Sequence, residues 1–483
     1  MAWCKLQLEY AANQLTPTKA LPRTTTDITT ASEGYWGPKC CNENTFGNID
    51  KHSFTVDKET THKILGVANN AFETQPVEVM LAALLHAFTI VFADRSTPTI
   101  FTEGHGREPW DNGINLTRTV GWFTSMYPIT VSLQSKQTLI EVLRRTKDAR
   151  RQVPANGWAY FTSRYLNPQG RQTFAQRGPM EVLFNYLGLY QQFEGPNAFL
   201  KWDQSLPTAA DVTDEMPRFA LIDVSSYVID NCLHFWFYMN RHMNHLEALD
   251  QWVEQCEISL REAAAILPTL DPAYTLSDFP LSSLTYEKFD EFLRCNQLRY
   301  GDLEDIYPCS PLQEGILVSQ AKNPDQYWTR YIWDVVTEKT QQGIDTDRLA
   351  RAWQQVVNRH ATLRTVFASL SADAFVDQVV LRHVTAAVRT ETRTENSPSE
   401  SGTSLGRTTL GRTQPPNELL IWRIGEDRVQ CKLLINHALI DAASIQILKR
   451  DFILAYDREL STEQAPPYRE YIAYLQGKDL EPD

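Results

Sequence analysis

The sequence predicts an α/β (α+β) protein with two lobes joined by a linker. Its 483 residues exceed what one hydrophobic core usually supports, so two or more domains are expected. Strand-like alternation and helix-like periodicity follow one another over residues 53–266. After a polar connector the same succession restarts near residue 305. We therefore expect two similar lobes, each with a mixed sheet packed against helices.

The first lobe is expected to span residues 53–284. Residues 1–52 are rich in Thr, Pro and Gly and have few apolar periods, which predicts a loosely structured leading segment. Apolar periodicity then predicts helices at residues 60–71, 77–93, 138–151 and 242–266. Strands are predicted at residues 54–56, 99–102, 129–133, 221–228 and 233–239.

The second lobe is expected to span residues 305–483, after a linker at residues 285–304. Its predicted strands are residues 328–336, 363–367 and 428–435, and its predicted helices are residues 346–359 and 443–459. Residues 394–416 are dense in Ser, Thr, Gly and Pro and cannot bury enough apolar surface to order themselves. This stretch is therefore predicted to be a mobile loop.

Bulk properties exclude several classes of function. The formal net charge of −13 argues against nucleic acid as a partner, because a phosphate binder needs a basic face. The longest apolar stretch contains Glu78 and His86, which favours a buried helix over a membrane span. The eight cysteines form no CxxC pair, so no metal site is expected. Scattered thiols and the lack of a secretory signal favour the cytoplasm.

A His-x-x-x-Asp pattern lies between a predicted strand and a predicted helix, in residues 436–442 (NHALIDA). A strand end would expose His437 at the rim of the sheet, where an imidazole can exchange protons near neutral pH. Asp441 is suited to fix the loop through an ion pair. A structural loop histidine with Asp441 capping the next helix fits the spacing equally well.

Two upstream stretches make this pattern more specific. Residues 305–315 (DIYPCSPLQEG) and 359–365 (RHATLRT) precede it. Together the three resemble, in order and spacing, the first core motifs of condensation domains in nonribosomal peptide synthetases. The resemblance implies a catalytic His437, supported by Asp441 and by Asn436, which replaces the family's first His. It also implies lobes of the chloramphenicol acetyltransferase type.

The first lobe carries three further motifs, residues 103–108 (EGHGRE), 118–128 (RTVGWFTSMYP) and 184–188 (FNYLG). They resemble the later core motifs of epimerisation domains, which are relatives of condensation domains. The resemblance implies that Glu103 is a catalytic acid–base group, because inversion of an α-carbon needs proton removal and return.

Other residues of these motifs are expected to support Glu103. The resemblance implies that Asn185 and Tyr186 assist the site, by hydrogen bonding to a developing enolate. Arg107 is expected to pair with a carboxylate and pin its loop. Trp122 and Phe123 are expected in the core.

The whole pattern resembles the C-terminal lobe of an epimerisation domain followed by the N-terminal lobe of a condensation domain. Such a protein would invert a carrier-bound aminoacyl or peptidyl thioester and condense it with the next one. It would bind no cofactor directly, because its substrates are presented on the 4'-phosphopantetheine of carrier domains. Carrier domains and neighbouring synthetase domains are the expected partners. Each site would lack half of its walls, so this chain alone is expected to be inactive or nearly so.

The sequence is compatible with two alternatives. A stand-alone acyltransferase of the plant-alkaloid type also has an HxxxD pattern, but its DFGWG element is absent here. A non-catalytic remnant that only binds carrier proteins is compatible with the sequence.

Overall fold

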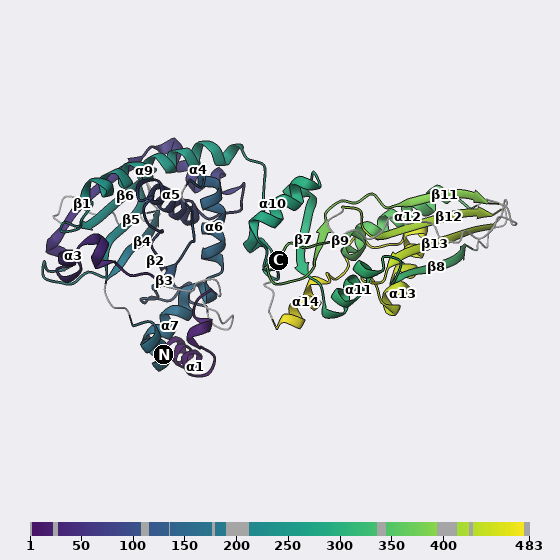
Figure 1. The fold of residues 1–483 in the computed structure, drawn as a ribbon, viewed down its shortest axis with the longest axis horizontal. Helices are drawn as coiled ribbons and strands as arrows, with labels where there is room; N and C mark the ends of the chain where they lie inside the picture. Colours follow the sequence, from purple (N-terminus) through teal and green to yellow (C-terminus); the bar gives the residue numbers. More distant parts are fainter. Residues whose placement is uncertain are drawn as a thin grey trace. The chain divides into compact units, whose positions relative to one another are not determined.

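The computed structural model describes residues 2–22, 28–107, 115–134, 136–175, 179–189, 212–335, 344–393, 413–424 and 428–477. The chain divides into two compact units, Met1–Ser277 and Asp278–Asp483 (Figure 1). The predicted linker, residues 285–304, therefore belongs to the second unit. It forms α10 (Tyr286–Cys295), whose Phe289 and Phe292 are buried, and it runs into β7 (Leu303–Pro308).

The first unit contains a six-stranded mixed sheet with the order β1-β6-β5-β4-β2-β3. The strands are β1 (Ile49–Val56), β2 (Ile100–Gly104), β3 (Ser125–Ile129), β4 (Met180–Leu189), β5 (Ala220–Ile229) and β6 (Cys232–Asn240). β4 runs parallel to both of its neighbours, β2 and β5, and the other pairs are antiparallel. The predicted strand at 129–133 lies earlier in the chain, because β3 pairs with β2 from Ser125 to Ile129.

Helices cover one face of this sheet, and they include α4 (Lys58–Leu65), α5 (Pro76–Val91), α6 (Leu139–Arg151) and α9 (Leu246–Ile266). α7 (Trp158–Leu166) contacts β3 instead, and α8 (Pro168–Thr173) packs against α7. The apolar α5 is buried nearly all round and packs against α6 and α9 (Figure 1). In β5 and β6 buried residues alternate with half-buried ones, so the opposite face is less covered. Across the described ranges no helix is long and apolar enough to cross a membrane.

The leading segment differs from its prediction. Its described part forms α1 (Ala2–Asn13), α2 (Glu33–Trp36) and α3 (Pro38–Asn42). Trp36 is fully buried, and the Arg95 guanidinium lies over its ring while pairing with buried Glu181 at 2.9 Å. A few aromatic anchors rather than a periodic apolar pattern hold this segment, which explains why its composition was misleading.

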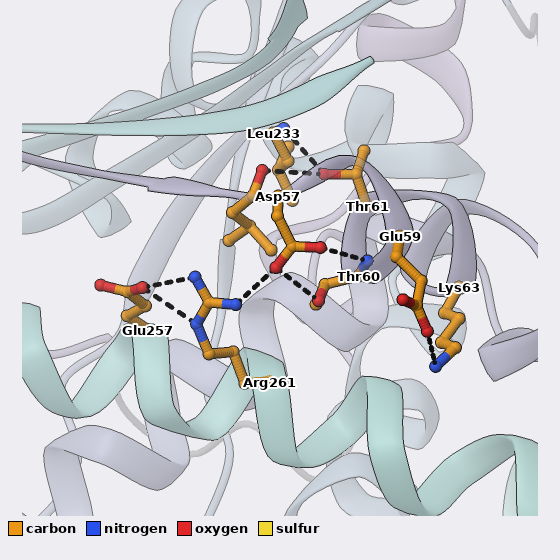
Figure 2. Close-up of polar contacts among 9 residues, drawn as sticks. Asp57, Glu59, Thr60, Thr61, Lys63, Leu233, Glu257 and Arg261 are labelled. Carbon is orange, nitrogen blue, oxygen red and sulfur yellow. Dashed lines mark hydrogen bonds and ion pairs between the residues drawn. The ribbon is translucent and has the colours of Figure 1, made fainter.

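The turn from β1 into α4 is tied to α9 by polar contacts (Figure 2). Asp57 caps α4 by accepting hydrogen bonds from the Thr60 amide and hydroxyl at 3.0 and 2.9 Å. Arg261 of α9 donates to Asp57 at 2.6 Å and to Glu257 at 2.8 Å. This cluster is partly exposed and connects two helices of the same unit.

The second unit divides its strands between two sheets, whereas one mixed sheet was expected. An antiparallel sheet has the order β7-β10-β9, and a mixed sheet has the order β11-β12-β13-β8. The further strands are β8 (Trp328–Val335), β9 (Thr365–Ala368), β10 (Asp377–Leu381), β11 (Val388–Arg393), β12 (Asn417–Ile424) and β13 (Arg428–Asn436). The predicted mobile loop at 394–416 lies outside the described residues, apart from 413–416.

The remaining helices are α11 (Pro311–Lys322), α12 (Thr346–Arg359), α13 (Ala442–Asp457) and α14 (Arg469–Gln476). α12 packs against α13, and the Trp353 and Phe452 rings meet edge to face between them. The predicted fold class is confirmed, since each unit combines sheets and helices around its own hydrophobic core.

Candidate functional site

His437 follows β13 directly and lies at the end of the mixed sheet in the second unit. Its ring is exposed, while its backbone N–H donates to the Tyr327 carbonyl at 2.8 Å. The side chain is therefore accessible although the backbone that carries it is fixed, as expected of a reactive group at a strand end.

Buried amide side chains hold both neighbours of His437. Asn436 is fully buried, donates to Gln320 at 2.9 Å and accepts from the Ala438 N–H at 2.9 Å. Gln313 donates to the Ala438 carbonyl at 2.8 Å. Gln313 and Gln320 both lie on α11, Gln313 inside the first motif and Gln320 after it. Neither residue was expected from the sequence to support the site. The only hint was the presence of Gln313 inside that motif.

Of the two roles considered for Asp441, an ion pair and a helix cap, the structure shows the cap, at the start of α13. Its carboxylate accepts from the Ser444 hydroxyl at 2.6 Å and from the Ser444 N–H at 2.8 Å. These bonds lower the pKa of Asp441, and within the described part of the chain it has no cationic partner. Ala442 is the first residue of α13, where alanine is favourable.

A pocket of about 570 Å³ opens beside His437, within the second unit. Its polar wall includes Gln313, His360 and His437. Its apolar wall includes Leu312, Ile316, Leu363, Ile447, Leu448 and Tyr471. A concave, largely apolar pocket with a few convergent polar groups is typical of a small-molecule or cofactor site.

The second motif is mainly structural. Arg359 pairs with Asp451 at 3.1 Å, and Arg364 is buried and pairs with Glu304 at 2.6 Å. These ion pairs fix the end of α12 and the start of β9. His360, between the two arginines, contacts Asp451 and lines the pocket.

Glu103 lies on β2 in the first unit. The parallel pairing of Thr102 with Phe184 brings Glu103 beside Asn185 of β4, whose side-chain amide donates to the Glu103 carboxylate at 2.7 Å. Burial raises the pKa of Glu103, and the negative charge of Asp223 on β5 raises it further. The structure thus joins two of the predicted site residues and adds Asp223, which the sequence analysis missed.

Tyr186 is not brought to Glu103. It follows Asn185 on β4, so its side chain points to the opposite face of the sheet. There it packs, half-buried, against the hydrophobic core, and burial raises the pKa of its hydroxyl. The alternation of side chains along a strand therefore separates two residues that the motif had placed together.

Arg107 pins its loop, as expected, but through carbonyl groups. It donates to the carbonyls of Leu116 and Thr119, at 2.7 Å each, and lies over the Phe123 ring. In the described residues it pairs with no carboxylate. Gly106 has a φ of 62°, and a Cβ there would lie 1.6 Å from the Phe123 carbonyl oxygen, so only glycine fits.

The two aromatic residues of this loop differ in burial. Phe123 is 9% exposed, which confirms its predicted place in the core. Trp122 is 91% exposed, so the same prediction was wrong for it. Phe123 is held by Arg107 and by an edge-to-face contact with Trp3, whereas its neighbour is left on the outside of the loop.

Comparisons with known proteins agree with these motifs. The sequence profile described as "Condensation domain" matches residues 40–267 and 303–483. Nonribosomal peptide synthetase ungA of Aspergillus violaceofuscus is 44% identical over 489 residues, which cover 99% of this chain and 5% of that protein. Synthetase fmqA of Aspergillus fumigatus is 41% identical over 486 residues, which cover 99% of this chain and 12% of that protein. The chain spans only a small part of these relatives.

Among solved structures, the epimerization domain from the third module of tyrocidine synthetase B has a TM-score of 0.47 and 24% identity. The match covers 55% of this chain and 59% of that domain. The profile match extends over most of this chain and over both units. The chain therefore belongs to the condensation-domain family of nonribosomal peptide synthetases.

Proposed function

We propose that the chain is a section of a synthetase in which the first unit serves epimerisation and the second serves peptide-bond formation. The observation that carries this proposal is the exposed His437 ring beside the pocket, on a backbone fixed by Asn436 and Gln313. A side chain that acts repeatedly on bound substrate needs an accessible functional group on a backbone that is held in place, and His437 has both.

In the second unit, the amine of a carrier-bound aminoacyl thioester attacks a second carrier-bound thioester. A C–N bond forms, the C–S bond breaks, and the proton lost by the amine is returned to the leaving thiolate. His437 orients the amine or takes its proton, while Asn436 and Asp441 position the loop. Holding two tethered thioesters together supplies much of the rate by raising their effective concentration.

In the first unit, Glu103 exchanges the α-proton of a carrier-bound residue. Its raised pKa suits a carboxylate that works near neutral pH, and Asn185 orients it. Arg107 holds the neighbouring loop. Tyr186 was expected to assist, but its position on the other face of the sheet gives it a packing role instead.

Carrier domains bearing 4'-phosphopantetheine present the substrates, and neighbouring synthetase domains complete the sites. We propose the cytoplasm as the location, because all eight cysteines are unpaired thiols. We also propose that this chain alone is inactive or nearly so, because each cleft needs a second lobe to close around its substrate.

The test compares this chain with a longer synthetase section that includes the adjoining lobes, using loaded carrier domains. We expect peptide bonds and α-carbon deuterium exchange only from the longer section. In that section His437→Ala should reduce peptide-bond formation by at least about 100-fold. Glu103→Gln should reduce α-carbon exchange and leave peptide-bond formation intact.

Two outcomes would contradict the proposal. Full activity from this chain alone would refute its inactivity. Carrier binding that survives while neither substitution has any effect would favour a non-catalytic carrier-binding remnant.

A further inference from the structure

The pocket beside His437 contains a second imidazole. His360 follows α12 and lines the same pocket, with 14% of its side chain exposed. Its backbone N–H donates to the Val356 carbonyl at 3.0 Å, so the residue is fixed to the last turn of α12. The proposed role of His437 makes no use of this second ring.

Asp451 of α13 holds one edge of the His360 ring. The distance between His360 Nε2 and Asp451 Oδ2 is 2.9 Å, and the Asp451 side chain is only 2% exposed. Arg359 and Arg450 also donate to this carboxylate, at 3.1 and 2.9 Å. Although burial opposes it, the hydrogen bonds from Arg450 and His360 keep the pKa of Asp451 below its usual value.

This geometry selects one tautomer of His360. Burial lowers the pKa of His360, and the nearby Arg359 and Arg450 oppose the attraction of Asp451, so the ring is neutral near pH 7. A neutral ring that faces a carboxylate through Nε2 carries its proton there. Nδ1 is then a hydrogen-bond acceptor, and among the described residues none donates to it.

We propose that His360 is a second polar anchor of the pocket, whose Nδ1 accepts a hydrogen bond from a primary amine bound there. Asp451 is the positioning residue that fixes the ring. The inference rests on the proposed function, since a primary amine is the nucleophile of peptide-bond formation. It assigns the pocket wall to the amine-bearing substrate rather than to the acyl donor.

The other charged and titratable groups around the pocket are few. Asp441 and His437 lie on the loop after β13, and Tyr468 and Tyr471 lie at α14. Asp441 is already engaged by Ser444. An amine at His360 would therefore be recognised by a neutral acceptor within a mostly apolar wall.

The test uses glycyl-pantetheine amide, in which an amide replaces the thioester, and its N-acetyl derivative, which lacks the amine. Binding to this chain is measured by calorimetry, and protection of His360 from diethyl pyrocarbonate is measured by mass spectrometry. The amine probe should protect His360, and the acetylated probe should not. His360→Phe and Asp451→Asn should weaken binding of the amine probe up to about tenfold, the effect of losing one hydrogen bond.

The control variant is His383→Phe, which alters an exposed histidine of the same unit outside the pocket and should leave binding unchanged. A merely structural role for His360 would weaken both probes equally, and that result would overturn the inference. Unchanged binding of the amine probe by His360→Phe would overturn the inference and leave the proposed function standing. If the original chain bound neither probe, the inference and the assignment of this pocket to peptide-bond formation would both fail.

Discussion

Glu103 and His437 are held in different ways. Glu103 lies on a regular strand, and its position follows from the register between β2 and β4, which brings Asn185 to it. His437 lies just beyond the end of a strand, where a single backbone bond, from its N–H to the Tyr327 carbonyl, continues the pairing of β13 with β8. Three buried amide side chains, those of Asn436, Gln313 and Gln320, hold the residues on either side of it. A strand site therefore depends on backbone pairing, whereas a loop site depends on a few specific side chains.

The largest change in stability is expected from a substitution in the loop that follows Glu103. Gly106→Ala should reduce the free energy of unfolding of the first unit by about 3 kcal/mol. The backbone at this position is left-handed, and the new Cβ would collide with the Phe123 carbonyl oxygen. Urea denaturation followed by tryptophan fluorescence measures this. The matched control is Gly315→Ala, in α11 with open space around it, which should stabilise the second unit slightly. Similar losses of unfolding free energy in both variants would contradict the conclusion that only glycine fits at position 106.

The next effect tests the amide clamp at His437. Asn436→Leu should reduce the stability of the second unit by about 2 kcal/mol, because it leaves the Ala438 N–H without its acceptor and Gln320 Oε1 without its donor. The same denaturation experiment measures this. Asn358→Leu, at an exposed position of α12, is the control and should be nearly neutral. Equal losses of stability in the two variants would mean that the buried hydrogen bonds of Asn436 do not stabilise the second unit.

A smaller effect concerns the charge of Glu103. Because its folded pKa is raised, its contribution to stability is fully present below the ordinary glutamate pKa and is lost as the pH rises through the raised value. Glu103→Gln should therefore unfold at a higher temperature than the original chain at about pH 8, and this gain should vanish near pH 4. Glu59→Gln, at a side chain that is 79% exposed, is the control. A gain in unfolding temperature that did not depend on pH would argue against a raised pKa for Glu103.

The smallest effect is expected at the cluster in Figure 2, whose residues belong to neither candidate site. The Thr60 N–H and Arg261 hold the pKa of Asp57 below its usual range, so this contribution is present at neutral pH and is lost in acid. The pair is exposed and screened, so Arg261→Ala should shift the unfolding midpoint by less than about 2 °C. High salt should remove the difference between the variant and the original chain. A shift as large as that of Gly106→Ala would contradict this order, because it would mean that the exposed ion pair matters as much as the loop that follows Glu103.

Much of the fold could be predicted because periodic segments dominate it. The helix predicted at 138–151 and the strand predicted at 233–239 agree with α6 and β6 within one or two residues. α1 was missed because its apolar residues show little periodicity. The exposure of Trp122 was missed because a long loop, unlike a strand or helix, gives no rule for which side chains face inward.

The sequence predicted the central residue of each candidate site but not most of the residues that surround it. The motifs identify Glu103 and His437, and the family match supports the motifs. Asp223 and Gln320 lie over a hundred residues from the groups they influence, so only the folded chain brings them there. Tyr186 shows the opposite limit, because adjacency in a motif does not mean adjacency on one face of a sheet.

The separate hydrophobic cores have a consequence for how such enzymes change during evolution. The core around Trp252 uses residues of the first unit alone, and the core around Trp353 uses residues of the second alone. A crossover between two synthetase genes at Ser277 would therefore transfer whole cores and leave none divided. We expect hybrid proteins joined there to fold, and hybrids joined within α9 or β13 to aggregate.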